Sequence, residues 1–377
     1  MLRDERFETI EVTPITGALG AEIRGVDLLN DDDAVIAEVK RALDEYHVLA
    51  VRDQGLDPTG LHKVARRFGP FSGNPVHTPM EGFDDVVRFV REPDDTGKVI
   101  GEEWHMDLAW LAKPPGITML FGEVVPPVGG DTCFTSLEKV YDSLSPLRRA
   151  DIHERLADAL LADERYARAH AEIARHLGEA PPTTDIVRRR IERCRLAGDD
   201  AMSALAFEAA AAHYASAVDA CDAVSDRDAT QRCDLLLRTV RAMLARNQPT
   251  KATDLAWRAV ADARDTQDPM FLATAALLLE EALWIASGFA TPATSAEVHR
   301  VLREAIDVTT DPATRVELLS RWPRVVHFAS DPSERMEPAS EAVALAARLE
   351  DPRSIAIAND GLRWALRKPI GGIRPTH

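Results

Sequence analysis

A histidine and an aspartate two residues apart, His105 and Asp107, have the side chains best suited to metal chemistry in this sequence. Imidazole and carboxylate provide two of the three ligands of the facial triad that holds iron(II) and leaves positions open for dioxygen and a second molecule. Alternate residues of a strand point to the same face, so a strand would let both side chains reach one ion. The pair therefore predicts two ligands of an iron(II) site.

The third ligand of such a triad has no obvious source in the rest of the sequence. The later histidines lie in helical or repetitive sequence, and helical repeats contact mainly their neighbours. We therefore predict that no third ligand completes the triad within one chain. If a later histidine did complete it, His153 is the first residue to test. The histidines considered by residue type alone are His153, His170, His176, His213, His299 and His327.

Composition limits the partners and the location of the protein. The 62 acidic and 45 basic residues give a formal net charge of −17, which argues against a broad nucleic-acid or anionic-membrane footprint. The N-terminus lacks an apolar signal core, and the most apolar stretch, 270–289, contains Glu280 and Glu281. We expect a cytoplasmic protein that binds neither nucleic acid nor membrane.

Four cysteines without paired spacing indicate buried free thiols rather than a disulfide framework.

Strand-like sequence is concentrated in residues 1–150. Residues 9–12 (TIEV) alternate, 48–51 (VLAV) form a short apolar run, and 86–90 (VVRFV) are rich in β-branched residues. Between the first two of these runs, residues 31–46 carry an apolar stripe with helical spacing. The sequence therefore predicts a mixed α/β region that ends near residue 150.

Helical sequence rich in alanine, leucine and arginine fills residues 151–377. Asp-Pro pairs recur there, and each is predicted to open a helix, because Asp is a good N-cap and Pro is tolerated at the first helical position. Small alanines at facing positions would let paired helices approach closely, as stacked helical hairpins require. We therefore predict a domain of 1–150 followed by an all-α repeat domain of 151–377. The four pairs are Asp268-Pro269, Asp311-Pro312, Asp331-Pro332 and Asp351-Pro352.

Five blocks in residues 7–149 resemble the N-terminal half of the TauD/TfdA (taurine dioxygenase) family of iron(II)- and 2-oxoglutarate-dependent dioxygenases. They are 17–28 (GALGAEIRGVDL), 48–54 (VLAVRDQ), 66–69 (RRFG), 104–107 (WHMD) and 129–132 (GGDT). The resemblance implies a double-stranded β-helix (jelly-roll), iron(II) as cofactor and 2-oxoglutarate as co-substrate. It makes the Thr132 hydroxyl a ligand of the distal carboxylate of 2-oxoglutarate, and His77 a substrate contact. A turn role for Thr132 and a surface-loop role for His77 stay open.

The same family places a second histidine on a late strand and an arginine about ten residues after it. Planar bidentate pairing with the 2-oxoglutarate carboxylate is the reason for arginine there. No such block follows Asp107 at the expected distance, and Arg335 follows His327 too closely. The resemblance therefore implies only a partial jelly-roll, and an α+β chain as a whole.

Residues 151–368 resemble the TPR-like helical region of bacterial signalling ATPases and LuxR-type regulators. The resemblance rests on 152–160 (IHERLADAL), 206–214 (AFEAAAAHY) and 342–352 (AVALAARLEDP). It implies a sensor or docking surface for a protein partner, without chemistry of its own. The sequence has no phosphate-binding glycine-rich loop of the P-loop type.

Two functions follow from these patterns, and the sequence leaves open which one holds and whether the chain is an enzyme. The first is an iron(II)/2-oxoglutarate-dependent dioxygenase that hydroxylates a small-molecule substrate of unknown identity, with an incomplete facial triad. The alternative is a non-catalytic fusion protein whose helical repeats bind a protein partner or act as a signalling scaffold.

Overall fold

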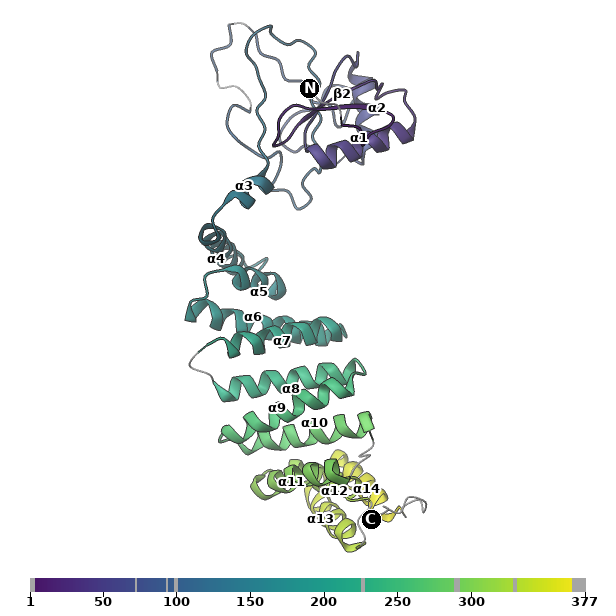
Figure 1. The fold of residues 1–377 in the computed structure, drawn as a ribbon, viewed down its shortest axis with the longest axis vertical. Coiled ribbons are helices and arrows are strands. Elements are labelled where there is room, and N and C mark those ends of the chain that lie inside the picture. Colours follow the sequence, from purple (N-terminus) through teal and green to yellow (C-terminus); the bar gives the residue numbers. More distant parts are fainter. Residues whose placement is uncertain are drawn as a thin grey trace. The chain divides into compact units, whose positions relative to one another are not determined.

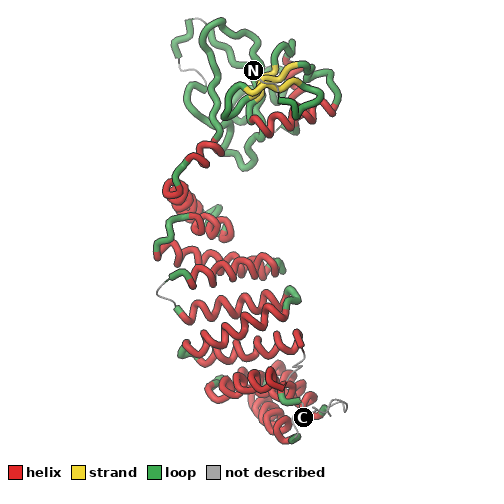
Figure 2. The backbone as a smooth tube through the Cα atoms, in the orientation of Figure 1, coloured by secondary structure: helices red, strands yellow, loops and turns green. Residues whose placement is uncertain are grey.

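The chain forms two compact units, Met1–Leu144 (unit 1) and Ser145–His377 (unit 2). A computed structural model describes residues 4–71, 73–92, 94–97, 101–224, 228–287, 292–327 and 331–367. It is mostly helical with one small sheet (Figure 2). The predicted assignment of domains to 1–150 and 151–377 stays a prediction.

Unit 1 is built on a three-stranded sheet with the order β1-β2-β3. Strand β1 pairs antiparallel with β2, placing Val12 opposite Ile23, and β2 pairs parallel with β3, placing Ile23 opposite Val51. Helices α1 and α2 lie beside the sheet (Figure 1). The elements of unit 1 are β1 (Glu11–Pro14), β2 (Ala21–Arg24), α1 (Asp33–Tyr46), β3 (Leu49–Val51), α2 (Pro58–Phe68) and α3 (Leu137–Ser143).

Local signals explain where α1 begins and ends. The Asp32 carboxylate accepts hydrogen bonds of 3.0 Å from the backbone N–H groups of Ala34 and Val35, which satisfies two otherwise unpaired donors. His47 ends the helix in the left-handed conformation, at φ 64°. The predicted apolar stripe faces the core of unit 1, where Ile36 and Val39 are buried.

The described part of unit 1 does not confirm the predicted partial jelly-roll, because it has only the three-stranded sheet. Residues 86–90 and 104–107 were expected to be strands, but the described residues between 52 and 136 contain no strand. A strand is stabilised by hydrogen bonds to a neighbouring strand, and this part of the chain has none beside it. The small core of unit 1 lies instead around the sheet and its two helices, with Ile10, Ile23 and Val64 buried.

Unit 2 is a stack of antiparallel helices, and each helix from α4 to α14 packs on the next one in the chain (Figure 1). Helices α8 and α10, α10 and α12, and α12 and α14 also contact one another. The TPR-like character of this stack stays a prediction. Its helices are α4 (Pro146–Ala162), α5 (His170–Glu179), α6 (Thr184–Ser203), α7 (Phe207–Asp222), α8 (Ala229–Ala245), α9 (Pro249–Asp265), α10 (Pro269–Ser287), α11 (Pro292–Val308), α12 (Pro312–Val325), α13 (Ser333–Leu349) and α14 (Pro352–Leu366).

The Asp-Pro pairs open helices as predicted. Asp311 accepts a 2.8 Å hydrogen bond from the backbone N–H of Thr314 at the start of α12. Asp351 accepts one of the same length from Ser354 at the start of α14. The other two pairs precede α10 and α13. These caps are local, which is why sequence spacing was sufficient to find them.

Helix α10 is long and apolar enough, by length and composition alone, to cross a membrane. Half of that stretch is buried inside unit 2, and the fully buried Glu280 lies within it. These are features of a core helix, so the span is weak evidence for a membrane segment.

Three of the four cysteines are buried in unit 2, as expected: Cys194, Cys221 and Cys233. Burial raises the pKa of the Cys221 and Cys233 thiols to about 11 and about 12. Cys133 is a correction to the expectation, because it is exposed in the loop before α3.

Candidate metal centre

The structure brings the side chains of His105 and Asp107 together. Nε2 of His105 lies 3.2 Å from Oδ1 of Asp107, and both side chains are about half exposed. Two neighbouring ligands, each about 2.1 Å from a metal ion, stand about 3 Å apart. The separation therefore fits two donors to one ion, although the residues lie in a loop and not on the expected strand.

A backbone contact orients the imidazole of His105. Its Nδ1 lies 2.8 Å from the carbonyl oxygen of Glu103, which can only accept, so Nδ1 carries a proton. In the neutral ring this leaves the lone pair on Nε2, facing the Asp107 carboxylate. A histidine that binds a metal usually donates its other N–H to a carbonyl or carboxylate in this way.

The electrostatics of the pair favour a positive charge between the two side chains. The hydrogen bond to the Glu103 carbonyl and, next, the charge of Asp107 raise the pKa of His105. A lone pair that faces a carboxylate oxygen at 3.2 Å is unfavourable unless a proton or a metal ion lies between them. The donor set therefore fits a divalent cation, with two protein ligands.

In the part of the chain that the structure describes, no third ligand accompanies this pair. Among the described residues, no group of three or more His, Cys, Asp or Glu side chains is arranged to hold a metal ion. His153, considered as an exception, is buried in unit 2, where its Nδ1 lies 2.8 Å from Nδ1 of His176. The other candidates also belong to unit 2: His170 contacts Arg193, His299 packs edge-on against Trp322, His327 packs edge-on against Trp364, and His213 lies on α7.

The two residues expected to contact small molecules lie elsewhere in unit 1. Thr132 is exposed in the loop that follows Gly129 and Gly130, which have φ of 79° and 74°. His77 packs edge-on against Phe89, with ring centroids 5.0 Å apart. Within the described part of the chain, no hydrogen bond or ion pair joins Thr132 or His77 to His105 or Asp107. Their roles stay predictions.

A second histidine–aspartate contact in unit 1 was missed by the sequence reasoning. Nδ1 of His62 on α2 lies 2.6 Å from Oδ1 of Asp85, whose side chain is nearly fully buried. Arg66, one turn later on α2, places its Nε 3.5 Å from the other carboxylate oxygen. The only feature of the sequence that pointed to this contact was the i, i+4 spacing of His62 and Arg66, which places both side chains on one face of a helix. The contact attaches the loop at residue 85 to α2.

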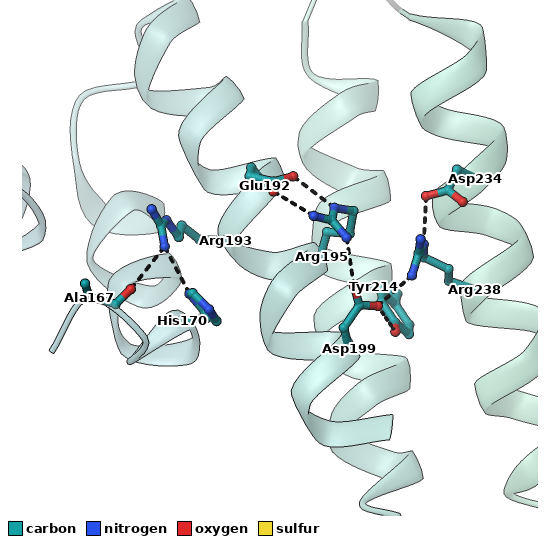
Figure 3. A network of polar contacts seen from close by, with 9 residues as sticks. All are labelled: Ala167, His170, Glu192, Arg193, Arg195, Asp199, Tyr214, Asp234 and Arg238. Atoms are coloured by element: carbon teal, nitrogen blue, oxygen red, sulfur yellow. Dashed lines mark hydrogen bonds and ion pairs between the residues drawn. The ribbon is translucent and has the colours of Figure 1, made fainter. Parts of the chain in front are cut away.

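A polar network connects α6, α7 and α8 of unit 2 (Figure 3). The Asp199 carboxylate lies at its centre and accepts hydrogen bonds of 2.6 Å from both the Tyr214 hydroxyl and Arg238. Arg195 donates to the other oxygen of Asp199 at 2.7 Å. Burial, reinforced by the contact with Asp199, raises the pKa of Tyr214 to about 12.

The outer members of this network complete its charge pairing. Glu192 accepts two hydrogen bonds from Arg195, and Asp234 accepts one from Arg238 (Figure 3). Beside the network, Arg193 donates to the carbonyl of Ala167 and contacts His170. Because the arginines and carboxylates are satisfied by one another, the arrangement holds helices together and offers no open chemical group.

Comparison with known proteins settles the lineage of the chain. The family described as "Taurine catabolism dioxygenase TauD, TfdA family" matches residues 11–344. The chain belongs to this family. Curated TauD/TfdA-type relatives are α-ketoglutarate-dependent dioxygenases by name, which supports the predicted general kind of function.

Three relatives show the extent of the likeness. The (S)-phenoxypropionate/alpha-ketoglutarate-dioxygenase of Delftia acidovorans is 32% identical over 44% of this chain and 60% of its own length. An alkylsulfatase of Acinetobacter baylyi is 32% identical over 37% and 44%. The alpha-ketoglutarate-dependent sulfate ester dioxygenase of Pseudomonas putida is 33% identical over 41% and 48%. This TauD/TfdA chain thus spans about half the length of the curated relatives it matches.

Proposed function

We propose that unit 1 carries a metal centre of the iron(II)- and 2-oxoglutarate-dependent dioxygenase type, in which His105 and Asp107 supply two donors of an incomplete facial triad. The observation that carries the proposal is the 3.2 Å approach of Nε2 of His105 to Oδ1 of Asp107, with Nδ1 of the same ring donating to a backbone carbonyl. Membership of the TauD/TfdA family supports iron(II) and 2-oxoglutarate as the metal and the co-substrate. The alternative of a non-catalytic scaffold is less favoured, because relatives such as those of Delftia acidovorans and Pseudomonas putida are dioxygenases by name.

Iron(II) bound together with 2-oxoglutarate would activate dioxygen, which is the oxidant for hydroxylation. In this proposal the Glu103 carbonyl fixes the tautomer of His105, so that Nε2 offers its lone pair. Asp107 supplies the second donor and neutralises one positive charge. The Thr132 hydroxyl would hold the distal carboxylate of 2-oxoglutarate, and His77 would contact the substrate.

A small organic anion is the substrate class that the relatives suggest. Their names include a phenoxypropionate, a sulfate ester and a sulfonate, each an anionic group on an organic body. We extend that class to this chain, and place the activity in the cytoplasm. Which anion is used is left to direct screening.

An iron(II) titration without oxygen tests the site apart from turnover. By calorimetry, with and without 2-oxoglutarate, we expect one equivalent of iron(II) to bind the full chain. His105→Ala and Asp107→Ala should each weaken this binding at least tenfold, because each removes one of two donors; loss of an outer-shell partner alone typically costs about 10–100-fold.

His77→Ala is the matched control, since it removes an imidazole from the same unit without touching the pair. It should leave iron(II) affinity unchanged. If the unmodified chain and His105→Ala bound iron(II) with equal affinity, the assignment of His105 as a metal ligand would be refuted.

A further inference from the structure

Contacts within its own loop, and not packing against a core, position the imidazole of His105. Residues 101–107 are all exposed, and the His105 side chain is 53% exposed. Among the described residues, the hydrogen-bond and ion-pair partners of the ring are the Glu103 carbonyl and the Asp107 carboxylate. Because no buried side chain restrains the ring, a small change in this loop should move it.

Gly101 lies against the edge of this ring that carries both nitrogen atoms. A Cβ atom at Gly101 would lie 3.3 Å from Cε1 of His105 and 4.0 Å from Nε2. Two carbon atoms are best separated by about 3.5–4.0 Å, so the ring would have to move by a few tenths of an ångström. Since Cε1 lies between the two nitrogens, this movement would disturb the contact with the Glu103 carbonyl and the approach to Asp107 together.

We propose that Gly101 is a positioning residue of the candidate metal centre. Without a side chain at this position, the ring of His105 can lie with Nδ1 on the Glu103 carbonyl and with Nε2 toward Asp107. A side chain there would displace the ring from the carbonyl that fixes its tautomer. The inference rests on the proposed function for the metal role of His105, whereas the position of the ring is measurable without any metal.

The backbone conformation of Gly101 has to be separated from its contact with the ring. Its φ of 83° is one that residues with a side chain rarely adopt, so a replacement also strains the backbone. Gly82 of the same unit is the matched control, because its φ is 85° and a Cβ atom there would meet nothing within 4 Å among the described residues. Gly82→Ala therefore carries the same backbone strain and leaves His105 untouched.

Nitrogen-15 NMR of the histidine rings tests the position of His105 in the metal-free chain. At an alkaline pH, where the ring is neutral, the proton of His105 should lie on Nδ1, and His105→Ala assigns its signals. Gly101→Ala should raise the share of His105 that carries the proton on Nε2, because the Glu103 carbonyl no longer holds the Nδ1–H group. Gly82→Ala should leave the signals of His105 unchanged.

Iron(II) titration without oxygen tests the consequence for the metal. Gly101→Ala should weaken binding about tenfold, the lower end of the about 10–100-fold that loss of a partner behind a metal ligand costs. Gly101→Asn should weaken it as much, because Asn tolerates a positive φ better than Ala but still places a Cβ atom beside His105. Gly82→Ala should bind iron(II) as tightly as the unmodified chain, and the helical circular dichroism should be the same in all three variants.

Three results would overturn the positioning role: unchanged His105 signals in Gly101→Ala, normal iron(II) affinity in Gly101→Asn, or an equal loss of affinity in Gly82→Ala. The last two would make backbone strain, and not the contact with the ring, the cause.

The metal assignment is decided separately by His105→Ala. If His105→Ala binds iron(II) as the unmodified chain does while Gly101→Ala still changes the His105 signals, the metal site is refuted and the positioning of the ring stands. If His105→Ala weakens binding and Gly101→Ala does not, the metal site stands and the role of Gly101 is refuted.

Discussion

The Nδ1 atoms of His153 and His176 lie 2.8 Å apart in the buried contact between α4 and α5. Two lone pairs cannot face each other at this distance, so one ring donates a proton to the other. Arg175 donates to Nε2 of His176 at 2.9 Å, which makes that nitrogen an acceptor. His176 therefore carries its proton on Nδ1 and donates it to His153, and the contact requires His176 to be neutral.

This geometry predicts that unit 2 loses stability in mild acid. Burial, and then the charge of Arg175, lower the pKa of His176. The unfolded imidazole takes up a proton near pH 6.5 while the folded one resists it, so the free energy of unfolding should fall as the pH drops below about 6.5. One such group changes it by at most about 1.4 kcal/mol per pH unit.

Urea unfolding followed by circular dichroism between pH 5 and pH 8 measures this dependence. His176→Asn should flatten this pH dependence only in part, because the partly buried His299 and His327, whose pKa values desolvation also lowers, still contribute. If the free energy of unfolding of His176→Asn depended on pH as steeply as that of the unmodified chain, the assignment of a neutral His176 in the folded state would be contradicted.

Glu280 and Arg324 should show a large energetic coupling. Glu280 is fully buried on α10, and both of its oxygens accept hydrogen bonds from the Arg324 guanidinium of α12. Removing one partner leaves a buried charge unpaired, so Glu280→Ala should destabilise unit 2 by about 3–5 kcal/mol. Glu280→Met with Arg324→Met should recover most of that loss. A double variant no more stable than Glu280→Ala in urea unfolding would argue against the pairing.

Gly198 on α6 should not tolerate a side chain, whereas Gly178 on the neighbouring helix α5 should tolerate one. A Cβ at Gly198 would lie 2.3 Å from Cε1 of Tyr214, which forces α6 and α7 apart. Gly198→Ala should therefore destabilise the protein by about 1–3 kcal/mol. At Gly178 a Cβ would meet only the Arg190 side chain, at 3.5 Å, and Gly178→Ala should be neutral or stabilising by up to about 1 kcal/mol. Thermal unfolding of the two variants compares them directly, and equal melting temperatures would contradict the close approach.

The chain on its own should not turn over 2-oxoglutarate. With iron(II) and ascorbate we expect succinate at the level of the protein-free background, because the described residues place two donors and no third at the candidate site. His105→Ala should then give the same low level. Stoichiometric succinate formation that disappears in His105→Ala would show that one chain completes the site by itself.

Helix ends and helix faces could be predicted because they depend on residues close together in the chain. The Asp311 and Asp351 caps form through backbone groups three residues away. The approach of His105 to Asp107 is local in the same way, although a loop and not a strand provides it. The residue pattern was sufficient to find both.

The tertiary structure decided what depends on distant partners. Residues 86–90 have the composition of a strand, but a strand needs a neighbour, and the structure places none beside them. His153 was considered as a metal ligand, yet packing of α4 on α5 buries it against His176, 23 residues away. The contact of Asp85 with His62 likewise depends on the fold, because α2 carries His62 and lies far from Asp85 in the sequence. The sequence by itself determined the family, the helices and the two candidate donors; the tertiary structure decided which side chains far apart in the chain meet, because burial and long-range packing are properties of the whole fold.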